Sequence, residues 1–162
     1  MNAELAHYLF RYEDGVLYWR NPSNPAKTPC GSIAGYVSKR GYTHIQYERK
    51  IHKAHRLIFL MFNGYTPGII DHIDGNINNN RPENLRAATH LGNAQNAKKR
   101  KDNSSGVKNV CWHKRLNKWG VSLSVSGKIR HFGYFDDLEL AALVAKETRQ
   151  KMFGDYAYQT GN

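Results

Sequence analysis

Cysteine is almost absent from this chain of 162 residues. Cys30 and Cys111 are its only two cysteines, and they stand 81 positions apart without forming a CxxC pair. Disulfide-rich secreted scaffolds and zinc ribbons both need several closely spaced cysteines, so neither class fits. We therefore expect two reduced, buried thiols.

Long apolar runs are also missing. The best of them, residues 57–62, is far shorter than the ~20 residues that a membrane-spanning helix needs. Residues 1–10 lack the basic start and apolar stretch of a secretory signal peptide. These absences predict an intracellular, cytoplasmic protein with no membrane partner.

Acidic residues are the third scarcity. There are 13 Asp and Glu against 24 Lys and Arg, which gives a net charge of +11. Such a field attracts a polyanion, either nucleic acid or an anionic membrane surface. The charge peaks in residues 98–132, which hold ten basic side chains and one acid, Asp102. A charge run is often only a solvated surface or a disordered tail, but aromatic residues such as Trp112 and Trp119 favour a folded module.

The chain divides into three blocks that together predict an α+β fold. The first block is rich in strand signals and closes with a short helix. The second is a polar loop between two short strands, followed by a helix, and the third has three short strands and a helix. A polar stretch without periodicity separates the last two blocks. The expected domains are a first domain at residues 1–99, a linker at 100–106 and a second domain at 107–162.

Turn residues and alternation place the elements of the first two blocks. In the second block, Thr89 is a good N-cap for a helix from His90 to about Lys99. The strands are expected at residues 15–19, 42–47, 50–52, 69–70 and 85–88, and the short helix of the first block at 55–62, closed by Asn63-Gly64.

The third block can bury a core of its own, because three strands and a helix are about the smallest unit that does so. Asp136 and Glu139 form a capping-box-like pair at the start of the helix, and Gly154 suits the position after its end. The strands are expected at 107–112, 118–125 and 128–134, and the apolar helix face comprises Leu138, Ala141, Ala142, Ala145, Thr148 and Met152.

The polar loop of the second block carries the residue types that phosphodiester hydrolysis needs. That reaction uses a hard cation held by oxygen ligands and a base that takes a proton from water. Asp71 offers a charged oxygen, and His72 offers a base with an ordinary pKa of about 6.5. Asn93, on the following helix, offers an amide oxygen, and Asn96 lies on roughly the same face. Asp and Asn are also common loop residues, so an isolated Asp-His pair would carry little weight.

The whole string of polar residues is far more specific than that pair. It comprises Asp71-His72, Asp74-Gly75-Asn76, Asn79-Asn80, Asn84-Leu85-Arg86, and Asn93 with Asn96, and His55-Arg56 precedes it. This string resembles the homing-endonuclease branch of the HNH family.

The resemblance implies a ββα-metal fold over about residues 68–99. It implies His72 as the general base, Asn84 as the residue that fixes the catalytic loop, and Asp71 and Asn93 as ligands of one Mg²⁺ or Mn²⁺ ion. Asn93 replaces the histidine usual at the second metal position, which argues against a soft metal such as zinc. His90 is the rival ligand. The supporting residues of the motif are His55, Arg56, Asn76 and Asn96.

The third block resembles the plant ethylene-response-factor (Apetala) type of DNA-binding domain. The matching residues are Ser105-Gly106-Val107, Val110, Trp112, Lys118-Trp119, Gly127-Lys128, the run from His131 to Phe135, and Glu139 with Ala141-Ala142. The resemblance implies a three-stranded sheet laid in the major groove, with phosphate contact the safer part. One of the two tryptophans is expected in the core. The candidate DNA contacts are Lys108, Trp112, Lys114, Arg115, Lys118, Trp119, Lys128 and Arg130.

Together these resemblances imply a metal-dependent endonuclease acting on double-stranded DNA, of the kind found in phage or intron mobile elements, in a bacterial or phage-infected cell. A monomer is favoured, and one site would nick one strand per encounter. Two alternatives stay open. The chain could be a DNA-binding regulator whose HNH-like part no longer cuts, or a structural RNA-binding protein, because positive charge alone does not separate RNA from DNA.

Overall fold

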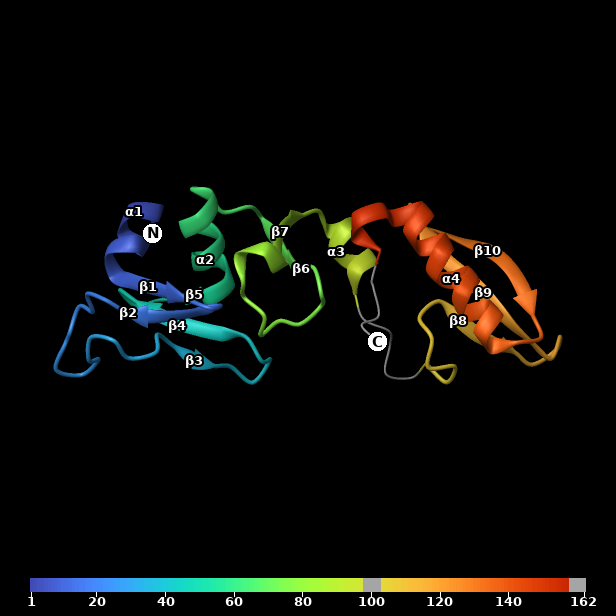
Figure 1. The fold of residues 1–162 in the computed structure, drawn as a ribbon, viewed down its shortest axis with the longest axis horizontal. Coiled ribbons are helices and arrows are strands. Elements are labelled where there is room, and N and C mark those ends of the chain that lie inside the picture. Colours follow the sequence, from blue (N-terminus) through green and yellow to red (C-terminus); the bar gives the residue numbers. More distant parts are fainter. Residues whose placement is uncertain (98–102, 158–162) are drawn as a thin grey trace. The chain divides into compact units, whose positions relative to one another are not determined.

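The computed structural model describes residues 1–97 and 103–157, which fall into two compact units, Met1–Thr89 and His90–Asn162 (Figure 1). Over these described residues the structure has four α-helices and four small antiparallel sheets, which confirms the predicted α+β class. The helix that begins at His90 is grouped with the second unit. Its predicted end near Lys99 and the first part of the predicted linker lie outside the described residues.

The first unit is built from short elements joined by tight turns. Asp14 and Gly15 adopt positive φ angles of 45° and 84° and close the first hairpin, as the sequence predicts. Its elements are α1 (Ala3–Leu9), β1 (Phe10–Glu13), β2 (Val16–Trp19), β3 (Tyr36–Val37), β4 (Thr43–Tyr47), β5 (Lys50–Lys53), α2 (Ala54–Asn63), β6 (Ile69–His72), the 3₁₀ turn η1 (Pro82–Asn84) and β7 (Leu85–Ala88).

Helix α2 forms the centre of the first unit's core. The predicted stop is confirmed: Gly64 takes a left-handed φ of 76° and its N–H bonds to the carbonyl of Leu60. Ile58 on α2 is fully buried in the same cluster as Phe10, Leu17 and Ile45. Burying each such side chain contributes about 1.5–3 kcal/mol. Figure 1 shows α1 and α2 on one side of strands β1 to β5.

Helix α1 and strand β1 are not predicted from the sequence. The helix has only seven residues and buries just Ala6 and Leu9, so its periodicity is too short to read. Its start is fixed by a side chain instead, because the Asn2 Oδ1 atom accepts a hydrogen bond of 3.0 Å from the N–H of Leu5.

The second unit holds a three-stranded sheet in the order β10-β9-β8, covered by helix α4. The predicted strands are confirmed, although β8 starts at Val110 rather than at residue 107 because Asn109 adopts a turn conformation with φ 69°. Its elements are α3 (His90–Asn96), β8 (Val110–His113), β9 (Lys118–Val125), β10 (Lys128–Phe135), α4 (Leu138–Phe153) and the 3₁₀ turn η2 (Gly154–Tyr156).

Two expectations about α4 are wrong. The N-cap is Asp137, whose Oδ1 atom accepts from the N–H of Leu140 at 2.8 Å, while Asp136 pairs with Lys118. Met152, expected on the buried face, is 38% exposed because that face continues from Ala145 through Arg149 to Phe153, which packs against the apolar cluster. Arg149 is buried in line with Ala141 and Ala145.

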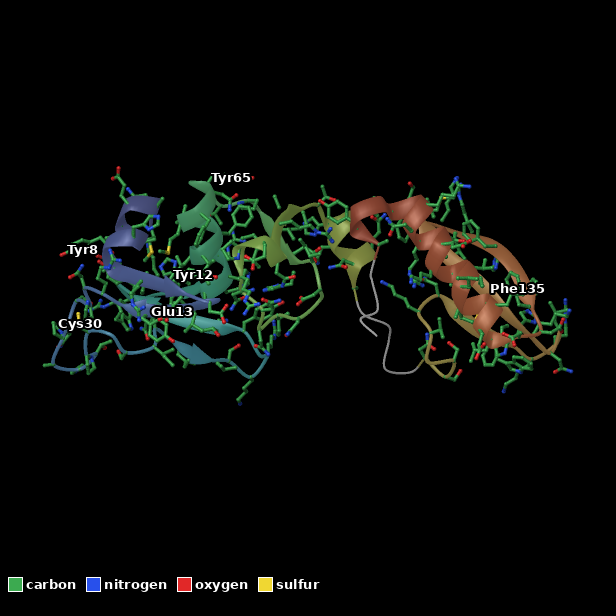
Figure 2. All side chains as sticks on the ribbon, viewed as in Figure 1. Tyr8, Tyr12, Glu13, Cys30, Tyr65 and Phe135 are labelled. Carbon is green, nitrogen blue, oxygen red and sulfur yellow. The ribbon has the colours of Figure 1, made fainter. Side chains whose placement is uncertain are left out.

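The two cysteines are unpaired, but the expectation that they are buried is wrong. Cys30 is exposed on the long connection between β2 and β3 (Figure 2), and its thiol donates to the carbonyl of Arg20. Cys111 is exposed on β8, where it pairs with Gly120 on the side of the sheet away from α4. Neither position faces an apolar cluster.

No helix in the described parts of the chain is both long enough and apolar enough to cross a membrane.

Candidate active site

The hairpin of β6 and β7 carries the two residues at the head of the polar motif. Asp71 pairs with Arg86, and His72 with Leu85, in an antiparallel register. Side chains of neighbouring strand residues point to opposite faces, so Asp71 and His72 leave the sheet on different sides. Both residues are about 95% buried.

The Asp71 carboxylate is held by an arginine directly across the hairpin. The Arg86 Nε and Nη2 atoms donate to the same Asp71 oxygen, Oδ2, at 2.8 and 2.7 Å. Only 6% of the Asp71 side chain and 16% of the Arg86 side chain is exposed. This pair fixes the orientation of the predicted metal ligand.

Asn84 is the centre of a hydrogen-bond net that closes the loop between the two strands. Its amide nitrogen donates to Asp74 Oδ1 at 3.0 Å and to the carbonyl of Asn79 at 2.8 Å, and its side-chain oxygen accepts from the N–H of Asp74. Its carbonyl accepts from the N–H of Ile73. The conformation of the loop therefore depends on the hydrogen bonds of one buried asparagine.

Asp74 ties the middle of this loop to both ends. Burial alone would raise the pKa of its carboxyl, but hydrogen bonds from Asn79, from the N–H of Asn76 and from Asn84 outweigh that effect, with the charge of His72 adding to them. The pKa of Asp74 is lowered as a result. The carboxylate is therefore ionised at neutral pH and accepts hydrogen bonds from Asn76, Asn79 and Asn84.

His72 is clamped between an amide and a second histidine. Its Nε2 atom lies 3.0 Å from Asn80 Oδ1, and its ring meets the ring of His55 edge-on at a centroid distance of 5.1 Å. An amide oxygen only accepts hydrogen bonds, so Nε2 carries the hydrogen and Nδ1 keeps its lone pair. This tautomer leaves Nδ1 as the basic nitrogen.

His55, on α2, is buried and stays neutral. Burial lowers its pKa to about 3, and the neighbouring charges of His72, Lys53, Arg56 and His44 act in the same direction. A neutral ring beside His72 adds no positive charge to the site at any pH above about 4.

The strand-rich block of the first unit braces the loop from outside. Arg81, at the end of the loop, pairs with Asp14 of the β1–β2 turn at 2.7 Å. The loop residue Ile77 lies so close to Gly41 that a Cβ there would come within 2.9 Å of its side chain. Arg56 donates to the carbonyls of Pro67 and Gly68, just before β6.

Asn93, the other predicted ligand, lies on α3 in the second unit and is exposed. His90, the rival, is exposed at the start of the same helix, and Asn96 is buried at its end. The supporting residue Asn76 lies in the loop of the first unit, where its side-chain oxygen accepts from the N–H of Asn78. Among the side chains that the structure describes, no three of His, Cys, Asp or Glu gather as a metal-binding group.

The predicted DNA contacts of the second unit do not share one face of its sheet. Trp112 pairs with Trp119, and Trp119 packs against the core under α4, so both lie on the helix side. Lys128 and Arg130 pair with Val125 and Leu123 and so start on that side too. Lys118 alternates to the open face, and Lys114 and Arg115 lie exposed in the β8–β9 turn.

Lys108 is engaged with helix α3 instead of being directed to solvent. Its ammonium donates to the carbonyl of Gln95 at 2.8 Å and to that of Ala97. Burial lowers its pKa to about 8, with the charge of Arg149 contributing.

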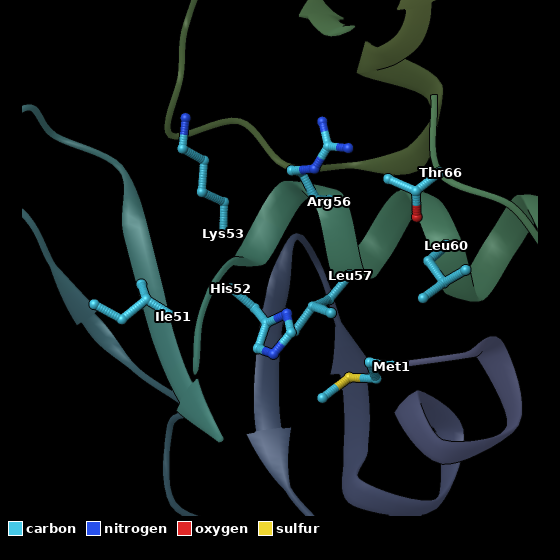
Figure 3. Close-up of a pocket in the computed structure, with 8 residues that line it drawn as sticks. All are labelled: Met1, Ile51, His52, Lys53, Arg56, Leu57, Leu60 and Thr66. Atoms are coloured by element: carbon cyan, nitrogen blue, oxygen red, sulfur yellow. The ribbon is translucent and has the colours of Figure 1, made fainter. Parts of the chain in front are cut away.

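A separate hollow of about 340 Å³ opens beside β5 and α2 (Figure 3). Of the predicted site residues only Arg56 lines it, so the hollow is not the site of the motif. Its lining residues are Met1, Ile51, His52, Lys53, Arg56, Leu57, Leu60 and Thr66.

Sequence reasoning did not assign roles to three residues that the structure places at the site. Asn80 contacts the predicted base, Arg86 holds the predicted ligand, and Asp74 binds the loop together. The signal for Arg86 is the hairpin register, because pairing Ile69 with Ala88 also sets Asp71 opposite Arg86. For the other two, only their place in the polar string pointed to the site.

Comparison with known proteins bears on this geometry. The HNH endonuclease family matches residues 52–95, from β5 through the hairpin and its loop into α3. Protein 3.8 of Escherichia phage T7 is 39% identical over 88 residues, which cover 54% of this chain and 72% of that protein. Residues 52–95 of this chain therefore match the HNH endonuclease family.

An uncharacterized HNH endonuclease of Acanthamoeba polyphaga mimivirus is 30% identical over 125 residues, which cover 75% of this chain. That match spans 64% of the mimivirus protein, so the chain covers less than two thirds of this relative. No solved structure matches the chain. The match to the HNH endonuclease family indicates nuclease activity for this segment. It ends at residue 95, before the sheet of the second unit.

Proposed function

We propose that this protein is a metal-dependent endonuclease of the HNH type that hydrolyses one phosphodiester bond of double-stranded DNA per encounter, with His72 as the general base. The observation that carries the proposal is the clamp on His72. A histidine buried in a polar loop, with Nε2 donating to Asn80 and Nδ1 left basic, is arranged to accept a proton.

The chemistry begins with a water molecule placed in line with the scissile phosphorus. His72 Nδ1 takes a proton from this water while the oxygen attacks phosphorus and the bond to the 3′ oxygen breaks. The leaving 3′ oxygen takes a proton from solvent water, so the products are a 5′-phosphate and a 3′-hydroxyl. Asn80 holds the ring in the productive tautomer, and Asn84 and Asp74 hold the loop that carries Asn80.

The donor set fits a hard divalent cation. Asp71 offers a carboxylate and Asn93 an amide, and both are oxygen ligands of the type that Mg²⁺ and Mn²⁺ prefer. When bound, such an ion would polarise the scissile phosphate and stabilise the charge on the leaving oxygen. Arg86 keeps the Asp71 carboxylate aligned, and His90 is the alternative to Asn93.

The sheet of the second unit supports the DNA-binding half of the proposal. Its face away from α4 bears Lys118, His131 and Tyr134, and no helix among the described residues covers it. The neighbouring turn adds Lys114 and Arg115, which are exposed. We propose that this face and turn contact phosphates, with Lys128 and Arg130 reaching the backbone only from the sheet's edge. The Apetala-like arrangement belongs to this proposal.

We also propose that the protein belongs to the homing-endonuclease branch and comes from a phage or intron mobile element. The phage and viral relatives support this proposal. One motif supplies one base, so we propose a monomer that nicks.

Cleavage of supercoiled plasmid tests the proposal. The full chain is incubated with Mg²⁺ or Mn²⁺, with EDTA, and as the His72→Ala variant, with His52→Ala as a matched histidine control outside the loop. We expect nicked product that disappears in EDTA and forms about 10²–10⁴-fold more slowly in His72→Ala. Equal cutting by His72→Ala and His52→Ala would remove His72 from this role.

The regulator is the second candidate, and it has a clear signature. A chain that binds DNA with salt-sensitive affinity but cuts no plasmid in any metal would be a DNA-binding protein with a silent HNH domain. Binding of structured RNA in preference to duplex DNA would favour the RNA-binding alternative.

A further inference from the structure

Helix α3 is too short to be stable by itself. It has seven residues, and isolated helices this short are marginal in water. Its buried residues are Gly92 and Asn96, while its one large apolar side chain, Leu91, is 52% exposed. The helix has no apolar face to lay on a sheet, so its position depends on specific contacts.

One of these contacts is an aromatic ring seated on the helix backbone. Tyr156, in η2 after α4, lies so close to Gly92 that a Cβ at this glycine would come within 2.7 Å of the Cε1 atom of the ring. Only glycine permits this approach. The ring therefore fixes the helix one residue before Asn93.

The second contact satisfies the carbonyl end of the helix. The last carbonyls of a helix have no partner within it, and a lysine ammonium near the C-terminus can serve them. Lys108 does so by donating to the carbonyls of Gln95 and Ala97. The Lys108 backbone is itself held, because the Arg149 guanidinium on α4 donates to its carbonyl at 2.8 Å.

We propose that Lys108 and Tyr156 are positioning residues for Asn93, so that cation binding by Asn93 depends on these two contacts to helix α3. The inference rests on the proposed function, in which Asn93 binds that cation. Lys108 acts through the backbone of α3 and touches neither metal nor DNA. Loss of a residue that orients a metal ligand typically weakens metal binding about 10–100-fold.

The test measures Mn²⁺ binding to the full chain, through the EPR signal of free Mn²⁺. We expect Lys108→Met to weaken Mn²⁺ binding by about 10-fold or more, and Lys108→Arg to retain most of it because a guanidinium can serve the same carbonyls. Lys146→Met is the matched control, because it removes one exposed lysine charge from helix α4 of the same unit. Hydrogen exchange at residues 90–97 should quicken in Lys108→Met only.

Tyr156→Leu is the second variant and decides the matter if Lys108→Met fails to fold. Unchanged Mn²⁺ affinity in the folded variants, beside weakened binding by Asn93→Ala, would overturn the positioning role and leave the proposed function intact. Unchanged affinity in Asn93→Ala would overturn the metal assignment and the inference together.

Discussion

At the scale of single residues, the site depends on two histidines with different tasks. His72 is the proposed base, and its ring packs edge-on against the ring of His55. His55 is withdrawn into the core, where burial lowers its pKa to about 3. Its ring fills space beside His72 without competing for a proton. Because the folded protein keeps His55 neutral, the protein loses stability in acid.

This cost gives a prediction for His55→Phe. In the unfolded chain the pKa of His55 is about 6.5, so below that pH the unfolded state takes up a proton that the folded state refuses. The wild-type free energy of unfolding should therefore fall by about 2 kcal/mol from this group between pH 6.5 and pH 5, and keep falling toward pH 3. His55→Phe cannot be protonated and should lack this component.

Urea unfolding at pH 7 and pH 5 measures the difference. His52→Phe is the control, because this histidine is only partly buried on β5. A wild-type protein and a His55→Phe variant with the same pH dependence would show that His55 is protonated in the folded state.

The sequence predicts much at this scale, but not the partners. Asp71, His72 and Asn84 are identified by their motif, and the turns at Gly15 and Gly64 by residue type. The clamp from Asn80 and the buried Arg149 could not be predicted, because each depends on how distant segments fold together. The expectation of buried cysteines is wrong because composition does not indicate whether a thiol lies in an exposed loop or on the open face of a strand.

At the scale of elements, the register of the β6–β7 hairpin places Asp71 opposite Arg86, so that the two form an ion pair. Its register sets the nearly buried Asp71 and Arg86 side by side with Leu85 turned to the core. Removing one partner of a buried pair leaves an uncompensated charge, whereas an exposed pair is worth little.

Replacing Arg86 tests this contrast. We expect Arg86→Met to lower the free energy of unfolding by about 3 kcal/mol, because it leaves the buried Asp71 carboxylate without its positive partner. Arg81→Met is the matched control: its pair with Asp14 is half or more exposed, so the loss of stability should be much smaller. Denaturant unfolding at pH 7 measures both, and equal losses would contradict the buried role of Arg86.

At the scale of the whole molecule, charge is divided unequally between the two units. Residues 98–162 hold 13 basic and 6 acidic side chains, a net charge of +7, against 11 and 7, or +4, in residues 1–97. Within the described residues, one face of the sheet of the second unit is free of helix. Predicting three strands and a helix needed only alternation and turns. The register of the strands was needed to tell which lysines lie on the open face. Helix α3 belongs to the second unit because Lys108 and Tyr156 contact it.

Salt dependence of DNA binding tests this division. Lys118→Gln removes a charge from the open face and should reduce the slope of log affinity against log salt by about 0.9, the value for one phosphate. Lys128→Gln removes a charge from a residue that pairs on the helix side, and should change the slope by much less. Fluorescence anisotropy on a duplex at several salt concentrations measures both slopes, and equal effects would place both lysines on phosphates.

The net around Asp74 also bears on how the protein ages. An aspartate followed by glycine is prone to close a succinimide ring, in which the glycine nitrogen attacks the aspartate side chain. In the folded loop the N–H of Gly75 donates to the carbonyl of His72 at 2.8 Å, and the Asp74 carboxylate is held by Asn79 and Asn84. The same bonds that shape the loop keep nitrogen and carboxyl apart, so isoaspartate should accumulate at this position mainly in chains that have unfolded.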